Sequence, residues 1–183
     1  MEFGHPASNS FVTELLDRLV IALQEISSNS DVSLIVLRSE GDRAFCAGAS
    51  FDELLSVSNL AEGKAFFGGG VGLISACDYV FAVEAASIRL SELSIGIAPL
   101  VIAPAVERKI GKAALAELAF APNEWKNAYW AKEKGLFSKV YEEVKEMDKE
   151  MDFFLQKMSS YNPNALVKMK RALWEGCEHW DSL

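Results

Sequence analysis

Three consecutive glycines and one isolated glutamate are the residues of this chain whose types and spacing could do chemistry. Gly68, Gly69 and Gly70 come directly before a short apolar segment with helical spacing. Glycines at a helix start let a ligand come close to backbone N–H groups, and the helix dipole favours negative charge there. Glu92 lies at a turn shortly after a strand-like run, which predicts a carboxylate at the edge of the same cavity. Neither feature alone names a function, because a run of glycines is also common in a flexible turn.

A second segment of small residues precedes the glycines. Ala47–Ala49 forms a predicted tight bend that leaves the backbone open to a ligand. Ser50 and Glu53 fit the S-x-x-E pattern of a capping box, which predicts that a helix begins at Phe51. The alternative interpretation is a strand-to-helix turn that is simply packed with small residues.

The elements that must position these residues alternate between strands and helices. Met1–Phe3 and Val32–Leu37 are predicted strands, and the second is short, apolar and β-branched, as expected for a strand covered on both faces. Between them, apolar residues recur every three or four positions from Phe11 to Ile26, which predicts an amphipathic helix. A strand–helix–strand order implies parallel pairing through a right-handed crossover.

The rest of the chain continues this alternation. Gly111 is predicted to divide two helices, Asn123 to cap a third, and Gly135 to end that third helix. The predicted strands are Tyr79–Val83, Ser87–Leu90 and Leu136–Tyr141, and the predicted helices are Pro99–Ile110, Lys112–Phe120, Glu124–Lys134, Glu143–Met158 and Asn164–Trp174.

Composition and charge exclude several classes of function. The 183 residues are half apolar and can bury one sizeable core. A net charge of −8 argues against a nucleic-acid partner, because no basic stripe is present to pair with phosphates. No apolar run approaches the length of a membrane span and the first residues do not form a signal peptide, so no membrane partner is predicted. Three widely spaced cysteines without a C-x-x-C pair favour free thiols in a reducing compartment, which predicts a cytoplasmic protein.

Taken in chain order, the motifs resemble those of the crotonase superfamily, the enoyl-CoA hydratase/isomerase group. The segments that carry the resemblance cover most of the chain: FCAGASFDEL (Phe45–Leu54), GGGVGLISACDYVFA (Gly68–Ala82), RLSELSIGIAP (Arg89–Pro99), ERKIGKAALAEL (Glu107–Leu118) and AKEKGLFSKVY (Ala131–Tyr141). The resemblance implies an α/β fold, with a crotonase-like spiral of ββα units at residues 1–142 and an incomplete C-terminal helical region at residues 143–183. It also implies a homotrimer or a dimer of trimers.

The resemblance assigns roles to the segments of small residues. The backbone N–H groups of Ala49 and Gly69 would form an oxyanion hole for the carbonyl oxygen of an acyl-CoA thioester. Ala47, Gly48, Ala49 and Gly68 would contact coenzyme A, which is part of the substrate rather than a tightly bound cofactor. No metal is implied. The local physics agrees for Gly69, since unpaired amides and the helix dipole favour negative charge at a helix start.

The acidic positions separate the reactions of this family. The resemblance places two glutamates in the hydratases, whereas here the first of these positions is Gly72 and the second is Glu92. Hydration divides the activation of water and the delivery of a proton between two carboxylates. A double-bond shift needs only one, so we expect a 3-enoyl-CoA to 2-enoyl-CoA isomerase in which Glu92 moves the proton. The apolar segment Pro99–Ala103 replaces the P-G-x-G-G turn of hydratases and is expected to raise the pKa of Glu92.

Two kinds of alternative stay open. The same fold could carry an enoyl-CoA hydratase with Asp52 or Glu53 as its second acid, or an acyl-CoA decarboxylase or thioesterase. A protein of another class, a CoA-binding or scaffold protein without turnover, would keep the fold and lose the reaction.

The spacing between the two small-residue segments is shorter than the family pattern, which places the rest of a helix and a further strand there. Here Lys64–Phe67 runs straight into Gly68. We therefore expect that a stretch is absent between Phe67 and Gly68. The family's opening strand and terminal helices are expected to be absent as well.

Overall fold

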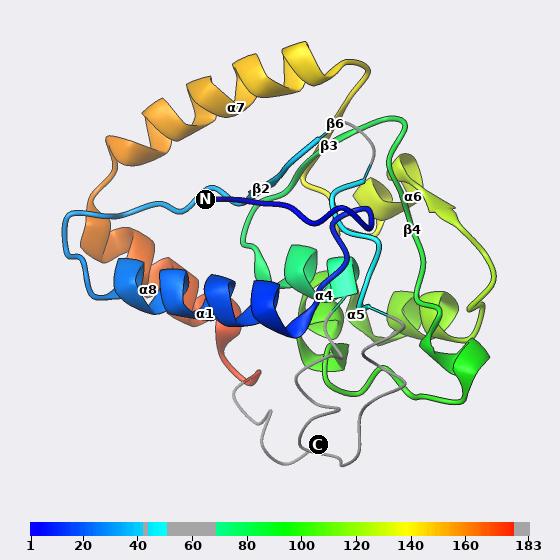
Figure 1. Ribbon diagram of the computed structural model, residues 1–183. Coiled ribbons are helices and arrows are strands. Elements are labelled where there is room, and N and C mark those ends of the chain that lie inside the picture. Colours follow the sequence, from blue (N-terminus) through cyan, green and yellow to red (C-terminus); the bar gives the residue numbers. More distant parts are fainter. Residues whose placement is uncertain (42–43, 51–68, 178–183) are drawn as a thin grey trace. The chain divides into compact units, whose positions relative to one another are not determined.

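Residues 1–41, 44–50 and 69–177 are described by the computed structural model of the protein (Figure 1). Contacts between Cα atoms divide the chain into two units, residues 1–70 and 71–183. The predicted division of the chain between residues 142 and 143 stays a prediction.

A parallel strand pair joined by one helix forms the described part of the first unit. Strand β1 (Glu2–Phe3) pairs in parallel with β2 (Arg38–Ser39), and helix α1 (Thr13–Ser27) lies between them in sequence. Helix α1 buries Leu15 and Leu19, which are four residues apart and therefore share one face. The predicted amphipathic helix is confirmed, and β1 pairs in parallel as predicted, but its partner is β2 rather than the predicted strand at Val32–Leu37.

The predicted strand at Val32–Leu37 is wrong. Strand β2 begins only at Arg38, and Val32 and Ile35 are 41% and 48% exposed. An apolar β-branched run becomes a strand only where a neighbouring backbone supplies hydrogen bonds along its length. Within the described ranges, no strand pairs with this run.

The second unit contains two strand pairs, a parallel one and an antiparallel one. Strand β3 pairs in parallel with β6, and β4 pairs antiparallel with β5. The described elements that follow β2 are α4 (Gly69–Ala76), which begins at the end of the first unit, β3 (Phe81–Val83), β4 (Ser87–Ile88), the 3-10 helix η1 (Glu92–Ile95), α5 (Ala103–Ala119), β5 (Lys126–Asn127), α6 (Ala128–Glu133), β6 (Lys139–Tyr141), α7 (Val144–Ser159) and α8 (Pro163–Trp174). The three strands predicted in this half are therefore confirmed in shorter form.

The predictions of where these helices break and where they are capped are partly confirmed. Gly111 interrupts α5 with a φ of 74° and a ψ of 164°, so the predicted break is confirmed. The predicted cap at Asn123 is wrong, because Asn127 caps α6 and its Oδ1 accepts from the Trp130 N–H at 2.8 Å. Asparagine suits a cap at either position. However, residues 126 and 127 pair with β4, and the helix begins only after that strand.

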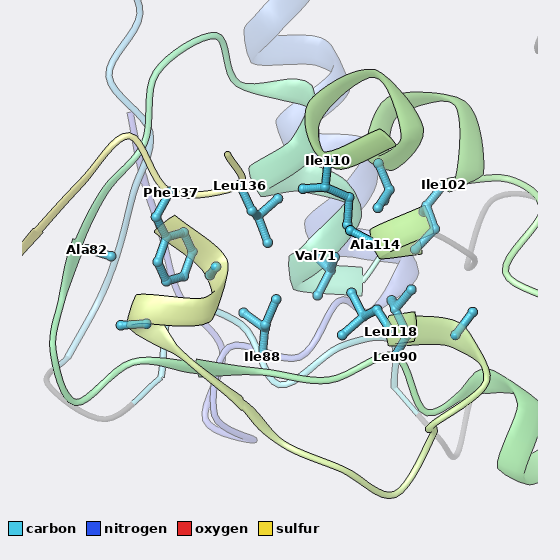
Figure 2. Packing of buried hydrophobic residues seen from close by; sticks show 14 residues of the cluster. Val71, Ala82, Ile88, Leu90, Ile102, Ile110, Ala114, Leu118, Leu136 and Phe137 are labelled. Carbon is cyan, nitrogen blue, oxygen red and sulfur yellow. The ribbon is translucent and has the colours of Figure 1, made fainter. Parts of the chain in front are cut away.

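A cluster of buried apolar side chains holds the second unit together (Figure 2). It joins Val71 of α4, Ile88 of β4 and Leu118 of α5, and Leu118 and Leu136 are completely buried. Leu90, which is 2% exposed, belongs to the same cluster. The packing of Leu90 anchors the segment that leads into η1, and with it the backbone of the acid two residues later.

Basic side chains neutralise the C-terminal end of α4. Arg108 Nη2 donates to the Ser75 carbonyl oxygen at 2.6 Å, and Lys109 Nζ donates to the Asp78 carbonyl oxygen at 3.1 Å. Carbonyl groups at a helix C-terminus lack partners within the helix and carry the negative end of its dipole, so cations stabilise them. The Asp78 carboxylate in turn accepts from Lys170 of α8 at 2.7 Å. These contacts tie α5 and α8 to the turn that follows α4.

Candidate active site

The backbone around Ala49 leaves its N–H group without an acceptor among the described residues. The Phe11 N–H donates to the Gly48 carbonyl oxygen at 2.8 Å, and the Ser50 N–H donates to the Phe11 carbonyl oxygen at 2.8 Å. In a parallel bridge of this kind, the N–H and C=O groups of the residue in between point away from the partner strand. No described residue accepts a hydrogen bond from the Ala49 N–H. This group therefore meets the first requirement of its predicted role, which is an unused donor.

Helix α4 begins at Gly69, as the run of glycines predicts. The φ of Gly69 is 28°, in the left-handed region that favours glycine. The first N–H groups of a helix have no acceptor within the helix, and the dipole places partial positive charge there. A Cβ added at Gly69 would lie 3.8 Å from the Gly48 Cα, an ordinary contact. The backbone conformation, rather than a lack of space, therefore selects glycine here, and Gly69 lies beside Gly48.

Sequence reasoning missed the part that Gly70 plays. A Cβ added at Gly70 would lie 3.0 Å from the carbonyl oxygen of Cys46 and 3.1 Å from its Cβ, closer than ordinary contacts. Glycine at this position lets the start of α4 pack directly against the backbone before Gly48. The signal in the sequence was the third glycine of the run, because close approach of two backbones is a common reason for glycine.

Cys46 supports the loop of small residues rather than serving as a nucleophile. The Gly48 N–H donates to Cys46 Sγ at 3.3 Å, and burial raises the pKa of the Cys46 thiol. The thiol therefore stays protonated at neutral pH, whereas nucleophilic attack needs the thiolate. The Ala47 N–H is also used within the loop, since it donates to the Ser8 carbonyl oxygen at 3.0 Å.

Glu92 is a partly buried acid at the first position of η1. The Ile97 N–H donates to its carbonyl oxygen at 3.0 Å and so fixes its backbone. Its carboxylate atom Oε2 is buried, and no described residue offers that oxygen a hydrogen bond. Burial raises the pKa of the Glu92 carboxyl, and the backbone N–H groups of Glu92 and Ser91 oppose this rise only in part. Buried polar atoms without partners are rare in native proteins, and acids with shifted pKa values gather at functional sites.

Position 72 supplies no second acid, because Gly72 is a buried glycine within α4. Asp52 and Glu53, the alternative second acids, lie outside the described residues, and so do the predicted helix start at Phe51 and Gly68. In the described part of the chain, no group of three or more His, Cys, Asp or Glu residues is placed to hold a metal ion. No helix there is long and apolar enough to cross a membrane.

The predicted site residues divide between the two units. Ala47, Gly48, Ala49 and Gly69 come together in the first unit, whereas Glu92 lies in the second. Their action on one thioester stays a prediction.

A family model described as enoyl-CoA hydratase/isomerase matches residues 1–64 and 55–181. The chain belongs to the enoyl-CoA hydratase/isomerase family.

Individual relatives support the same assignment. The crystal structure of an enoyl-CoA hydratase from Bacillus anthracis matches with a TM-score of 0.81 and 26% identity, over 92% of this chain and 75% of that one. The predicted α/β crotonase fold is therefore confirmed. The YngF protein of Bacillus subtilis (strain 168) is 30% identical over 198 residues, which cover 94% of this chain and 75% of YngF. The mitochondrial enoyl-CoA hydratase of Pongo abelii is 30% identical over 158 residues, which cover 73% of this chain and 54% of that enzyme.

The chain is shorter than these relatives. It spans three quarters of YngF and just over half of the Pongo abelii enzyme. The alignment with YngF extends over 198 positions, more than the 183 residues of this chain, so YngF has residues without a counterpart here. This agrees with the short spacing between the two small-residue segments. The junction of Phe67 and Gly68 itself lies outside the described residues.

Proposed function

We propose that the protein acts on acyl-CoA thioesters and moves the double bond of a 3-enoyl-CoA to give a 2-enoyl-CoA. In this proposal Glu92 transfers the proton, and the N–H groups of Ala49 and Gly69 bind the thioester oxygen. The backbone of Ala47–Ala49, together with Gly68, contacts the coenzyme A portion. Family membership supports the class of substrate, and the acids of this chain support the reaction.

The observation that carries the proposal is the buried Oε2 atom of Glu92, which has no partner among the described residues. A carboxylate whose backbone is fixed, and one of whose oxygens has no partner among the described residues, is suited to exchanging a proton with a substrate. Burial raises the pKa of this group toward neutral pH, and a general base works best when its pKa lies near the working pH. Position 72 carries no acid, and the proposal therefore assigns the reaction to one carboxylate.

One carboxylate is enough for the complete isomerisation. The Glu92 carboxylate removes a proton from C2 of the 3-enoyl-CoA, and the electron pair of that C–H bond spreads over the thioester and the C3=C4 double bond. The negative charge on the thioester oxygen is stabilised by the two backbone N–H groups. Protonated Glu92 then returns the proton to C4, the double bond closes between C2 and C3, and the carboxylate is regenerated.

The direct test supplies the purified protein with a 3-enoyl-CoA and, separately, with a 2-enoyl-CoA in water. We expect conversion of the first to the 2-enoyl-CoA, and slower or undetectable addition of water to the second, because hydration lacks its second acid. Chromatography of the CoA products distinguishes the two reactions.

The outcomes of that test decide between the candidate functions. The hydratase named among the relatives makes hydration the second candidate, and faster hydration than isomerisation would replace our proposal with it. Binding of several acyl-CoAs without any turnover would instead indicate a CoA-binding or scaffold protein.

The pH dependence of turnover is a second expected result. Only the ionised carboxylate accepts a proton, and burial raises the pKa of Glu92. We therefore expect kcat/KM to rise with pH through a midpoint above about 4.3, the ordinary pKa of a glutamate, and then to level off. A pH–rate profile of kcat/KM in the wild-type protein measures this midpoint. A kcat/KM that does not fall at acidic pH, or a midpoint at the ordinary pKa of a glutamate, would contradict a role for the buried acid.

The predicted homotrimer or dimer of trimers and the predicted cytoplasmic location stay predictions. The Pongo abelii relative, by contrast, is named as a mitochondrial enzyme.

A further inference from the structure

Ile102 occupies the space that a side chain at position 72 would need. A Cβ built on Gly72 would lie 2.5 Å from Ile102 Cγ2 and 3.2 Å from Ile102 Cβ. Real Cβ atoms essentially never come within 3.0 Å of a heavy atom outside their own residue and its chain neighbours. Even alanine at position 72 therefore requires Ile102 to move, and a longer side chain requires it to move further.

The surroundings of Ile102 prevent its side chain from moving easily to another position. Its side chain is 4% exposed and belongs to the same buried cluster as Val71 and Leu90 (Figure 2). A β-branched side chain has few allowed χ1 rotamers, and a close-packed interior leaves little room for another one. Its backbone is also fixed, because Ile102 immediately precedes α5 and the Val106 N–H donates to its carbonyl oxygen at 3.0 Å.

Position 72 is where a second acid would matter most. Gly72 follows Gly69 by three residues within α4, and residues with this spacing share one face of a helix. A carboxylate at position 72 would therefore project from the same face as the proposed oxyanion donor, about one turn along the helix. The segment that carries Ile102 is the apolar stretch Pro99–Ala103, which begins a few residues after η1 and Glu92.

We propose that Ile102 determines the specificity of the reaction by excluding a second carboxylate, and the water it would orient, from the site beside Gly72. This inference rests on the proposed isomerase function. In hydration, one carboxylate takes a proton from water while the oxygen of that water bonds to C3, and the other carboxylate gives a proton to C2. With only Glu92 present, the proton that leaves C2 returns to C4 and no water is added. Positions 72 and 102 must then change together to convert one reaction into the other.

The test is a set of variants at the two positions: Gly72→Glu, Ile102→Gly and the two combined. Urea unfolding measures stability, and product analysis measures isomerisation and hydration. We expect Gly72→Glu to destabilise the protein through overlap with Cγ2, and Ile102→Gly to destabilise it by leaving a cavity. We expect the double variant to be more stable than the sum of the two losses predicts. Glycine at position 102 removes the overlap with the new side chain, and glutamate at position 72 fills part of the cavity that the loss of the isoleucine side chain leaves. We also expect only the double variant to gain hydration of 2-enoyl-CoA, by about tenfold or more, the size of effect that a second acid can supply.

Ile102→Val is the matched control for the contact itself. Valine keeps the Cβ and both γ carbons and loses only the terminal methyl group, so the overlap with a side chain at position 72 stays. Gly72→Glu combined with Ile102→Val is therefore expected to remain destabilised and to show no gain in hydration.

Three results would overturn the inference. These are additive stability losses in the double variant, equal rescue by valine and glycine at position 102, or a double variant that is stabilised yet does not hydrate. The unfolding measurements need no turnover, so they stay informative if the wild-type protein does not isomerise 3-enoyl-CoA. That last result would refute the proposed function, whereas additive unfolding energies would refute the role of Ile102.

Discussion

Glu92→Gln is expected to lower isomerase turnover by about 100- to 10,000-fold, the range over which a positioned acid or base accelerates proton transfer. Glutamine keeps the shape of the side chain but cannot accept the proton from C2. The binding of acyl-CoA is expected to change far less, because the proposed contacts to coenzyme A come from the loop of small residues. Single-turnover kinetics with a 3-enoyl-CoA, together with a binding titration, separates the two effects. Turnover near that of the wild-type protein would remove Glu92 from the mechanism.

The same substitution is expected to raise stability at neutral pH. Because burial raises the pKa of Glu92 in the folded state, the folded protein holds its proton to higher pH than the unfolded chain does. Stability therefore falls as the pH rises from the unfolded pKa through the folded pKa, and the charged form is the costly one above that window. Glutamine avoids that cost, so its advantage in Tm should be present at neutral pH and disappear in acid.

Glu133→Gln is the matched control for the loss of one negative charge. The Glu133 side chain is 73% exposed and pairs with Lys134 on the surface. Exposed pairs of this kind contribute little to stability, so neither turnover nor Tm should change appreciably. A rise in Tm of equal size in both variants would show that net charge, and not burial of Glu92, causes the effect.

Ala49→Pro is expected to lower turnover by about 100- to 1000-fold, as the loss of one oxyanion donor typically does. Proline removes the N–H group and adds no polar group. Because no described residue accepts a hydrogen bond from this N–H, the variant loses no hydrogen bond to the described part of the chain. The preceding residue is glycine, which lacks the Cβ that proline crowds. We therefore expect kcat to fall while Tm stays close to that of the wild-type protein.

Ser50→Pro is the comparison that tests this reasoning. The Ser50 N–H donates to the Phe11 carbonyl oxygen at 2.8 Å, so proline one position later removes a hydrogen bond that holds the loop. That variant should lose stability as well as turnover. Retained turnover in Ala49→Pro would show that the Ala49 amide does not bind the thioester oxygen.

Much of the fold could be predicted from local patterns. The spacing of Leu15 and Leu19 predicts α1, the run of glycines predicts the start of α4, and Gly111 marks the break in α5. Each of these depends on residues within a few positions of one another. The predicted strand at Val32–Leu37 and the predicted cap at Asn123 failed because their outcome depended on strand partners elsewhere in the chain.

By itself, the sequence determined the resemblance to the family and most of the helices and strands, and that resemblance predicted a single acid, Glu92, where hydratases carry two. These follow from residue types and spacing along the chain. Only the tertiary structure decided that the Ala49 amide has no acceptor among the described residues, that the Glu92 oxygen Oε2 is buried without a described partner, and that Ile102 fills the space beside Gly72. The physical reason is that hydrogen bonding, burial and overlap are set by residues brought together from distant positions, and no local pattern records them.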